Sequence, residues 1–290
     1  MKKNKLAIIL TGPYRYTNYV LSTLERVIES DLEFDVFIHV WENDLGNKVR
    51  KQVIVDKDII TQNPYVKSVT YARAYTEEQI ASKWGHHTGC HSTINAMFGM
   101  FTAINTQISI IKVLPDYNTY SHVLRIRTDC ALFIKKISKS QLNDKILVAK
   151  NYSIPNSWIS DHLMLTSIDK FNAIWGYSNI NEFAKDFDSA GRNPEKMLAD
   201  RIKKLNYSKL LSEAWVRGED YHIVYNPAKE DDPCHIKYVL NKYGIEALFE
   251  YTLSKEDIEN VRIINKHWHN SNKYYDTFYS KLKRYIKKMI

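Results

Sequence analysis

Residues 5–41, KLAIILTGPYRYTNYVLSTLERVIESDLEFDVFIHVW, contain the pattern that decides the fold. Lys5 to Thr11 is a nearly continuous apolar run that ends at Gly12-Pro13, as expected of a strand buried on both faces of a parallel sheet. Apolar residues then recur at helical spacing from Thr17 to Glu29, and Asp35 to Trp41 is a second buried strand. Strand, helix and strand in this order predict a βαβ unit.

The chain continues in the same α/β manner, with no internal repeat and no linker rich in Gly, Ser or Pro. Pro194 directly after Asn193 is typical of a helix start. We therefore predict one α/β domain over residues 1–270, with a mostly parallel central sheet flanked by helices. Further strands are expected at Val66–Tyr71, His122–Ile126, Ile146–Ala149 and His162–Leu165, and further helices at Ser92–Val113 and Pro194–Leu205.

The last segment, residues 271–290, is predicted to be a separate basic amphipathic helix. Its apolar residues share one helical face, and lysines and arginines occupy the rest of Lys273 to Ile290. Such a helix can lie on anionic lipid headgroups, or it can pack on the domain with a solvated basic face. The pattern leaves both interpretations open.

Composition narrows the class of protein. With 44% hydrophobic residues and only 9 Gly and 7 Pro in 290, the chain is not collagen, low-complexity disorder or an integral membrane bundle. The formal charge of +8 favours an anionic partner. Three cysteines without paired spacing argue against a disulfide framework. No window of about 18 apolar residues and no long apolar N-terminal stretch occur, so we expect a soluble cytosolic protein.

Candidate ligand contacts follow two predicted strands, where open α/β sheets bind ligands. Gly12 permits a close backbone approach and Arg15 can contact a diphosphate, although both also suit an ordinary strand-to-helix turn. Arg125, Arg127 and Asp129 are expected to alternate onto one strand face. Arg127 would neutralise phosphate oxygens and Asp129 would hold a divalent cation; the alternative is a purely structural Arg–Asp pair.

Acidic residues and histidines supply the remaining candidates. A general base is sought among Asp161, Glu195, Glu219 and Asp220, although a helix start alone explains Glu195. The run HHTGCH at residues 86–91 lacks a second Cys/His pair at zinc-finger spacing. His267 and His269 flank Trp268 and are candidate metal or phosphate ligands.

Six short motifs in a fixed order carry a family resemblance. They are KLAIILTGPYR, DVFIHVW, the helix with Asn95 and Met97-Phe98, VLRIRTDC, SDHLML and NPEKML. From about Lys5 to Leu198, the chain resembles the GT-A-type bacterial glycosyltransferases of the WavE kind, which build lipopolysaccharide cores and capsules. The resemblance implies a GT-A-like, Rossmann-like fold.

The resemblance also implies site roles. A nucleotide-sugar donor would lie over the first strands, near Gly12, Arg15, Arg125, Arg127 and Asn95. Asp129 is similar to the last acidic residue of the DxD element that holds Mn²⁺ or Mg²⁺ on the donor diphosphate. Arg127 stands where the first aspartate would be, so either a cation or Arg127 would carry that charge.

Asp161 or Glu195 would supply the catalytic base for inversion at the anomeric carbon. We therefore predict a nucleotide-sugar-dependent glycosyltransferase that extends a surface saccharide or lipid-linked saccharide and binds no nucleic acid. It would be cytoplasmic, held at the inner face of the bacterial inner membrane by the C-terminal helix. One alternative is a non-catalytic binder of anionic glycan or nucleic acid, but no RNA-binding signature occurs in the sequence. The other is a sulfotransferase or nucleotidyltransferase, but the first loop lacks the Gly/Lys/Ser string that would bind phosphate.

Overall fold

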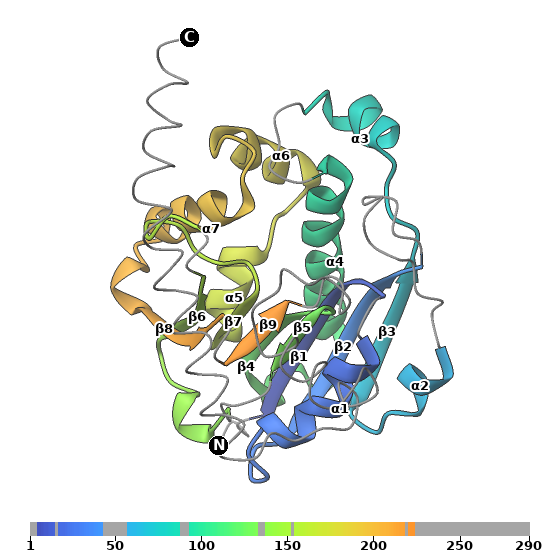
Figure 1. Ribbon diagram of the computed structural model, residues 1–290, viewed down its shortest axis with the longest axis vertical. Coiled ribbons are helices and arrows are strands. Elements are labelled where there is room, and N and C mark those ends of the chain that lie inside the picture. The colour runs from blue at the N-terminus through green and yellow to red at the C-terminus, as the bar shows by residue number, and fades with distance from the viewer. Residues whose placement is uncertain are drawn as a thin grey trace, which may run out of the picture.

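The computed structural model describes residues 5–14, 17–42, 57–87, 93–132, 137–151, 154–217 and 220–223. These residues form a seven-stranded sheet flanked by helices, with strand order β3-β2-β1-β4-β7-β6-β8 (Figure 1). Its strands are β1 (Lys5–Pro13), β2 (Phe34–Trp41), β3 (Val66–Ala72), β4 (Tyr120–Arg127), β6 (Ile146–Lys150), β7 (Leu163–Ser167) and β8 (Leu211–Val216). A small second sheet pairs β5 (Cys130–Leu132) with β9 (Tyr221–Ile223).

The sheet is mostly parallel, as the apolar runs predict. β1 pairs in parallel with β2 and β4, β2 pairs in parallel with β3, and β6 pairs in parallel with β8. β7 is antiparallel to both of its neighbours, β4 and β6. The reversal of β7 brings the start of that strand to the edge of the sheet where β1 and β4 end.

Seven α-helices are described. The cap residue Asn193 accepts a hydrogen bond from Lys196 N at 2.8 Å and Pro194 follows it, so the helix start predicted there is confirmed. The helices are α1 (Thr17–Val27), α2 (Lys57–Gln62), α3 (Glu77–Trp84), α4 (Ile94–Val113), α5 (Ile168–Trp175), α6 (Ile180–Ser189) and α7 (Pro194–Lys204). The predicted helix at residues 271–290, and the boundary at residue 270, lie outside the described residues.

Alternate side chains of the central strands point into two apolar layers. Leu6, Ile8 and Leu10 of β1 pack into the layer that contains α1, whereas Ala7 and Ile9 pack into the layer that contains α4 and α5. Figure 1 shows the helices of these two layers. Burial on both faces explains why β1 and β2 have continuous rather than alternating apolar sequences.

Helix α4 is the one described helix that is long and apolar enough to cross a membrane, so the expectation that no apolar window of about 18 residues occurs is wrong for this helix. Most of it is buried, and it packs across β1 and β2. Phe98, Phe101 and Ile104 face the core, while Thr102, Thr106 and Ser109 lie on the side away from the sheet. Here α4 is a core helix of the α/β layer.

Candidate active site

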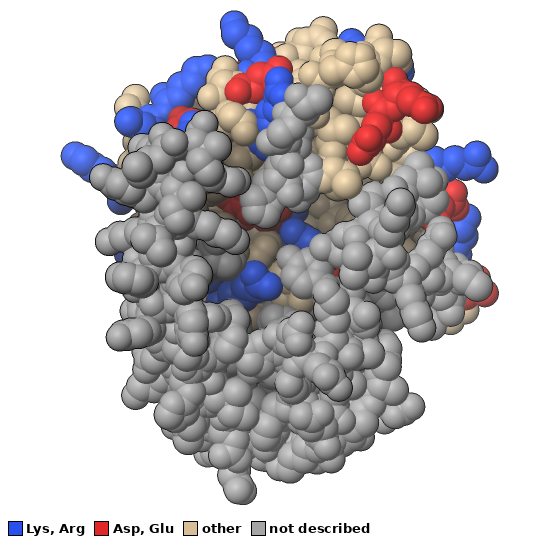
Figure 2. All heavy atoms as spheres, turned by 45° about the horizontal axis from the view of Figure 1, so that its top comes forward, with Lys and Arg blue, Asp and Glu red and all other residues tan. Residues whose placement is uncertain are grey.

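The carboxyl ends of β1, β2 and β4 meet the start of β7 at one edge of the sheet. Thr11 lies in register between His39 of β2 and Arg127 of β4, and Asp161 and His162 directly precede β7. Figure 2 turns this end of the molecule toward the viewer and shows blue and red atoms on the floor of a hollow. Ligands of open α/β sheets bind at such an edge.

Arg127 and Asp129 form a bidentate pair at this edge. Arg127 Nε donates to Asp129 Oδ1 at 2.8 Å, and Nη2 donates to Oδ2 at 2.9 Å. Asp129 lies in the turn after β4 rather than on the strand, so the pair forms across that turn. Asp129 is only 1% exposed, whereas the Arg127 side chain is 22% exposed. Two parallel hydrogen bonds fix the plane of the guanidinium, and part of the Arg127 side chain stays exposed.

Arg125 lies beneath this pair and is 1% exposed. Its Nη2 is 3.9 Å from Asp161 Oδ2, and its guanidinium carbon lies 5.1 Å from the centre of the Trp175 ring. Within the described residues, its Nε and Nη1 have no hydrogen-bond partner. Burial lowers the pKa of Arg125 to about 10. The sequence analysis predicts that Arg125 contacts the nucleotide-sugar donor. The structure places its guanidinium against Asp161 and below the surface.

Asp161 is the buried anion between the two arginines. Its Oδ2 is 3.7 Å from Arg127 Nη1, in addition to its contact with Arg125. Burial alone would raise the pKa of this carboxyl, but the nearby positive charges, Arg127 foremost, bring it below the usual value. Asp161 is therefore ionised at neutral pH.

Glu195 reaches the same place from the first turn of α7. Ile159 N donates to Glu195 O at 3.2 Å, which ties the segment before β7 to the start of this helix. Burial and then the negative charge of Asp161 raise the pKa of Glu195 to about 7. Two acidic groups with pKa values pushed apart in this way are typical of acid–base sites.

Gly12 and Thr128 bring the end of β1 close to the turn after β4. Thr128 Oγ1 donates to Pro13 O at 2.7 Å, and Thr128 N donates to Thr11 O at 3.3 Å. Gly12 has a φ of +147°, and a Cβ added there would lie 2.4 Å from Thr128 Oγ1. The site therefore needs glycine at this position for both backbone and space.

Gly12→Ala is expected to lower the free energy of unfolding by about 1–3 kcal/mol, because it combines backbone strain with a clash. Urea denaturation checks this. Gly85→Ala is the matched control, since Gly85 also has a positive φ (+85°) but nothing lies within 4 Å of an added Cβ. Equal losses for the two variants would contradict the close approach of Thr128.

Three other predicted candidates make contacts of their own. Asn95 is buried in the first turn of α4, where its Oδ1 accepts from Ala96 N at 3.0 Å. His87 contacts Asp188 Oδ1 at 3.0 Å and joins the end of α3 to α6, and Asp220 accepts from Val216 N. Arg15, Glu219, His267, His269 and the Cys90 and His91 part of HHTGCH lie outside the described residues.

Two histidines at this edge were not predicted. His39 is 3% exposed, neither ring nitrogen has a partner among the described residues, and burial lowers its pKa to about 4. His162 contacts Tyr221 Oη through Nδ1 at 2.9 Å, and burial lowers its pKa to about 3. Both rings are neutral at pH 7. Each histidine lies within or beside an apolar run, which predicts a buried strand and gives no signal for a functional side chain.

Among the described residues, no group of three or more Asp, Glu, His or Cys side chains is placed to hold Mn²⁺ or Mg²⁺. These cations prefer carboxylate oxygens, but both Asp129 oxygens already accept hydrogen bonds from Arg127. Asp161 lies between two guanidinium groups, which would repel a second cation. A cation at Asp129 would share these carboxylate oxygens with Arg127.

Neither the protein-family models nor the curated proteins compared with this sequence give a match. The resemblance to WavE-type glycosyltransferases therefore stays a prediction from the motifs. The geometry of the Arg127, Asp129, Asp161 and Glu195 cluster is independent of that resemblance.

Proposed function

We propose that this protein is a GT-A-like glycosyltransferase that moves a sugar from a nucleotide-sugar donor to a hydroxyl of a growing surface glycan, a lipopolysaccharide or a capsule. The observation that carries the proposal is the cluster at the carboxyl edge of the sheet. It combines a partly exposed arginine, two buried aspartates and a glutamate whose pKa is raised to about 7.

The two halves of this cluster suit the two needs of sugar transfer. The departing diphosphate gains negative charge, and the exposed part of Arg127, held by Asp129, can stabilise it. The acceptor hydroxyl must lose a proton, and Glu195 is half ionised near neutral pH, where a general base works best. Asp161 keeps the two arginines in place and raises the pKa of Glu195.

With Glu195 as the single base, the acceptor attacks the anomeric carbon directly and the configuration inverts. The bond between that carbon and the donor phosphate oxygen breaks as the new glycosidic bond forms, and Glu195 takes the acceptor proton. We also propose a cytoplasmic location at the inner face of the bacterial inner membrane, which depends on the basic segment Lys273 to Ile290.

Transfer is expected to persist in millimolar EDTA, with at least about half of its rate, because Arg127 occupies Asp129 and supplies the positive charge. Release of free nucleotide from a panel of nucleotide sugars, with and without EDTA, measures this and tests the enzyme assignment together. A rate that EDTA abolishes and Mn²⁺ restores would show that Arg127 does not replace the cation.

A further inference from the structure

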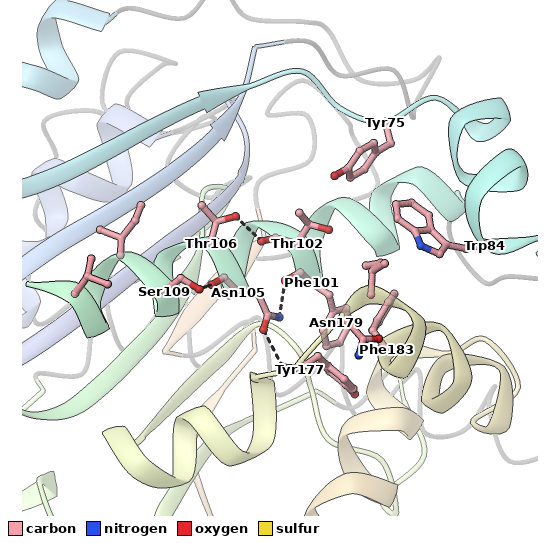
Figure 3. Close-up of a pocket in the computed structure, with 13 residues that line it drawn as sticks. Tyr75, Trp84, Phe101, Thr102, Asn105, Thr106, Ser109, Tyr177, Asn179 and Phe183 are labelled. Atoms are coloured by element: carbon pink, nitrogen blue, oxygen red, sulfur yellow. Dashed lines mark hydrogen bonds between the residues drawn. The ribbon is translucent and has the colours of Figure 1, made fainter.

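A second concave site runs along the side of α4 that faces away from the sheet. It is a groove of about 650 Å³ (Figure 3). Thr102, Thr106 and Ser109 of α4 lie along it, Tyr75 and Trp84 line one end, and Tyr177 lies on the opposite side. No residue of the Arg127 cluster lines it, and no charged side chain among the described residues does so.

Two hydroxyl groups of the groove, those of Thr106 and Ser109, are oriented by the helix. Thr106 Oγ1 donates to Thr102 O and Ser109 Oγ donates to Asn105 O, each at 2.9 Å. Each hydroxyl hydrogen is therefore used within α4, and the oxygen lone pairs remain as acceptors. A ligand that fits these oxygens must bring hydrogen-bond donors of its own.

The wall formed by the α5–α6 connection is held in place. Asn105 Nδ2 donates to Phe101 O at 2.9 Å and to Trp175 O at 3.0 Å, and its Oδ1 accepts from Tyr177 N at 2.8 Å. The Arg201 guanidinium packs 3.9 Å from the centre of the Tyr177 ring. The groove is thus pre-formed, which lowers the entropic cost of binding.

This lining separates three classes of ligand. An acyl chain would cover the Thr106 and Ser109 oxygens without offering them a hydrogen-bond donor. An anionic ligand would meet no positive charge among the described residues that line the groove. A neutral saccharide has hydroxyl donors for the acceptor oxygens and apolar C–H faces for the Tyr75 and Trp84 rings.

Side-chain contacts connect the groove lining to residues near the candidate active site. The Trp41 ring, at the end of β2, lies 6.3 Å from the Tyr75 ring and 4.7 Å from the His39 ring. On the other side, Tyr177 Oη contacts Met197 Sδ at 3.7 Å, two residues after Glu195 on α7. Side-chain contacts therefore link the groove lining to β2, whose His39 lies at the same sheet edge, and to α7, which carries Glu195.

We infer that this groove binds a neutral saccharide segment. If the proposed function holds, that segment is the part of the acceptor glycan that does not react. The groove would then select the acceptor by its length and sugar composition, while the Arg127 cluster binds the nucleotide-sugar donor and catalyses the transfer.

Saturation-transfer NMR with neutral tetramers of glucose, galactose and N-acetylglucosamine tests the inference, with dodecyl alcohol as the acyl-chain probe. Wild type is expected to bind at least one tetramer. Thr106→Val keeps the side-chain volume but removes the acceptor oxygen, and it should weaken tetramer binding about tenfold. Thr106→Ser keeps the oxygen and is the matched control, expected within about twofold of wild type.

Failure to bind any tetramer, or equal binding by the Val and Ser variants, would overturn the inference. So would dodecyl alcohol that binds more tightly to Thr106→Val than a tetramer binds to wild type. Thermal shifts with nucleotide sugars, measured on the same samples, separate the two proposals. Tetramer binding without a nucleotide response would refute the transferase and leave the groove assignment standing.

Discussion

Glu195→Gln is expected to lower kcat by about a hundred- to ten-thousandfold while leaving donor affinity within about twofold. Glutamine has nearly the same shape but cannot take the acceptor proton. Nucleotide release under saturating substrate measures kcat, and donor affinity is measured separately by thermal shift. Glu182→Gln is the matched control, because Glu182 also occupies the first turn of a helix, α6, but is exposed and bonded to Ser178.

The same residue fixes the pH dependence. The pKa of Glu195 is about 7 in the folded protein, above the ordinary value of 4.5, so kcat should rise with pH through about 7 and then level off. The free energy of unfolding changes with pH in the opposite direction to kcat. The proton on Glu195 stabilises the fold at low pH, and this contribution is lost as pH rises through 7. Glu195→Gln should therefore be more stable than wild type at pH 8.

Two outcomes would remove Glu195 as the base. One is a glutamine variant that keeps more than about a tenth of the wild-type kcat, since general-base catalysis contributes at least about a hundredfold. The other is an unchanged pH profile in that variant. In either case Asp161 would be the next carboxyl to test.

Arg127→Lys is expected to lower kcat/KM by about a hundred- to a thousandfold. This is the loss typical of removing a hydrogen-bond donor that stabilises negative charge in the transition state. Lysine keeps the charge but cannot make both hydrogen bonds to Asp129. The ammonium group of the lysine would therefore no longer be held toward the diphosphate. Steady-state kinetics with donor varied measures this. Arg192→Lys, which alters an exposed pair with Asp188 on α6, is the control.

A double-mutant cycle of Arg127→Lys with Asp129→Asn measures whether the two side chains act together. If Asp129 acts by holding Arg127, the two losses will not add, and the coupling will be about 1 kcal/mol or more. Additive losses would mean that Asp129 has a role of its own, such as binding a cation. That result would reopen the metal assignment.

Much of the fold could be predicted because it depends on local patterns. The continuous apolar runs at Lys5 and Asp35 predict strands buried on both faces, and the structure confirms both. The start of α7 is set by Asn193 and Pro194, which act within one turn. Short helices such as α5 and α6 were not predicted, because their apolar residues are few and their positions depend on packing.

The site could be predicted only in part. Arg127 and Asp129 are two residues apart, so their pairing follows from proximity along the chain. The contacts of Asp161 depend on the reversal of β7, and an apolar run such as HLML carries no direction. The raised pKa of Glu195 depends on Asp161, more than thirty residues earlier in the sequence. Tertiary structure alone brings these groups together.

The proposed nucleotide-sugar transfer is tested most directly by thermal unfolding of the wild-type protein with a panel of nucleoside phosphates and nucleotide sugars, in the presence of EDTA. A ligand at a hundred times its Kd stabilises a protein by about 2.7 kcal/mol, roughly 5–10 °C for a chain of this size. We predict a shift of this size for one class among UDP, GDP, CMP and TDP sugars, and its loss in Arg127→Lys. No shift with any nucleotide, or a preference for adenosine phosphates, would contradict the assignment as a glycosyltransferase.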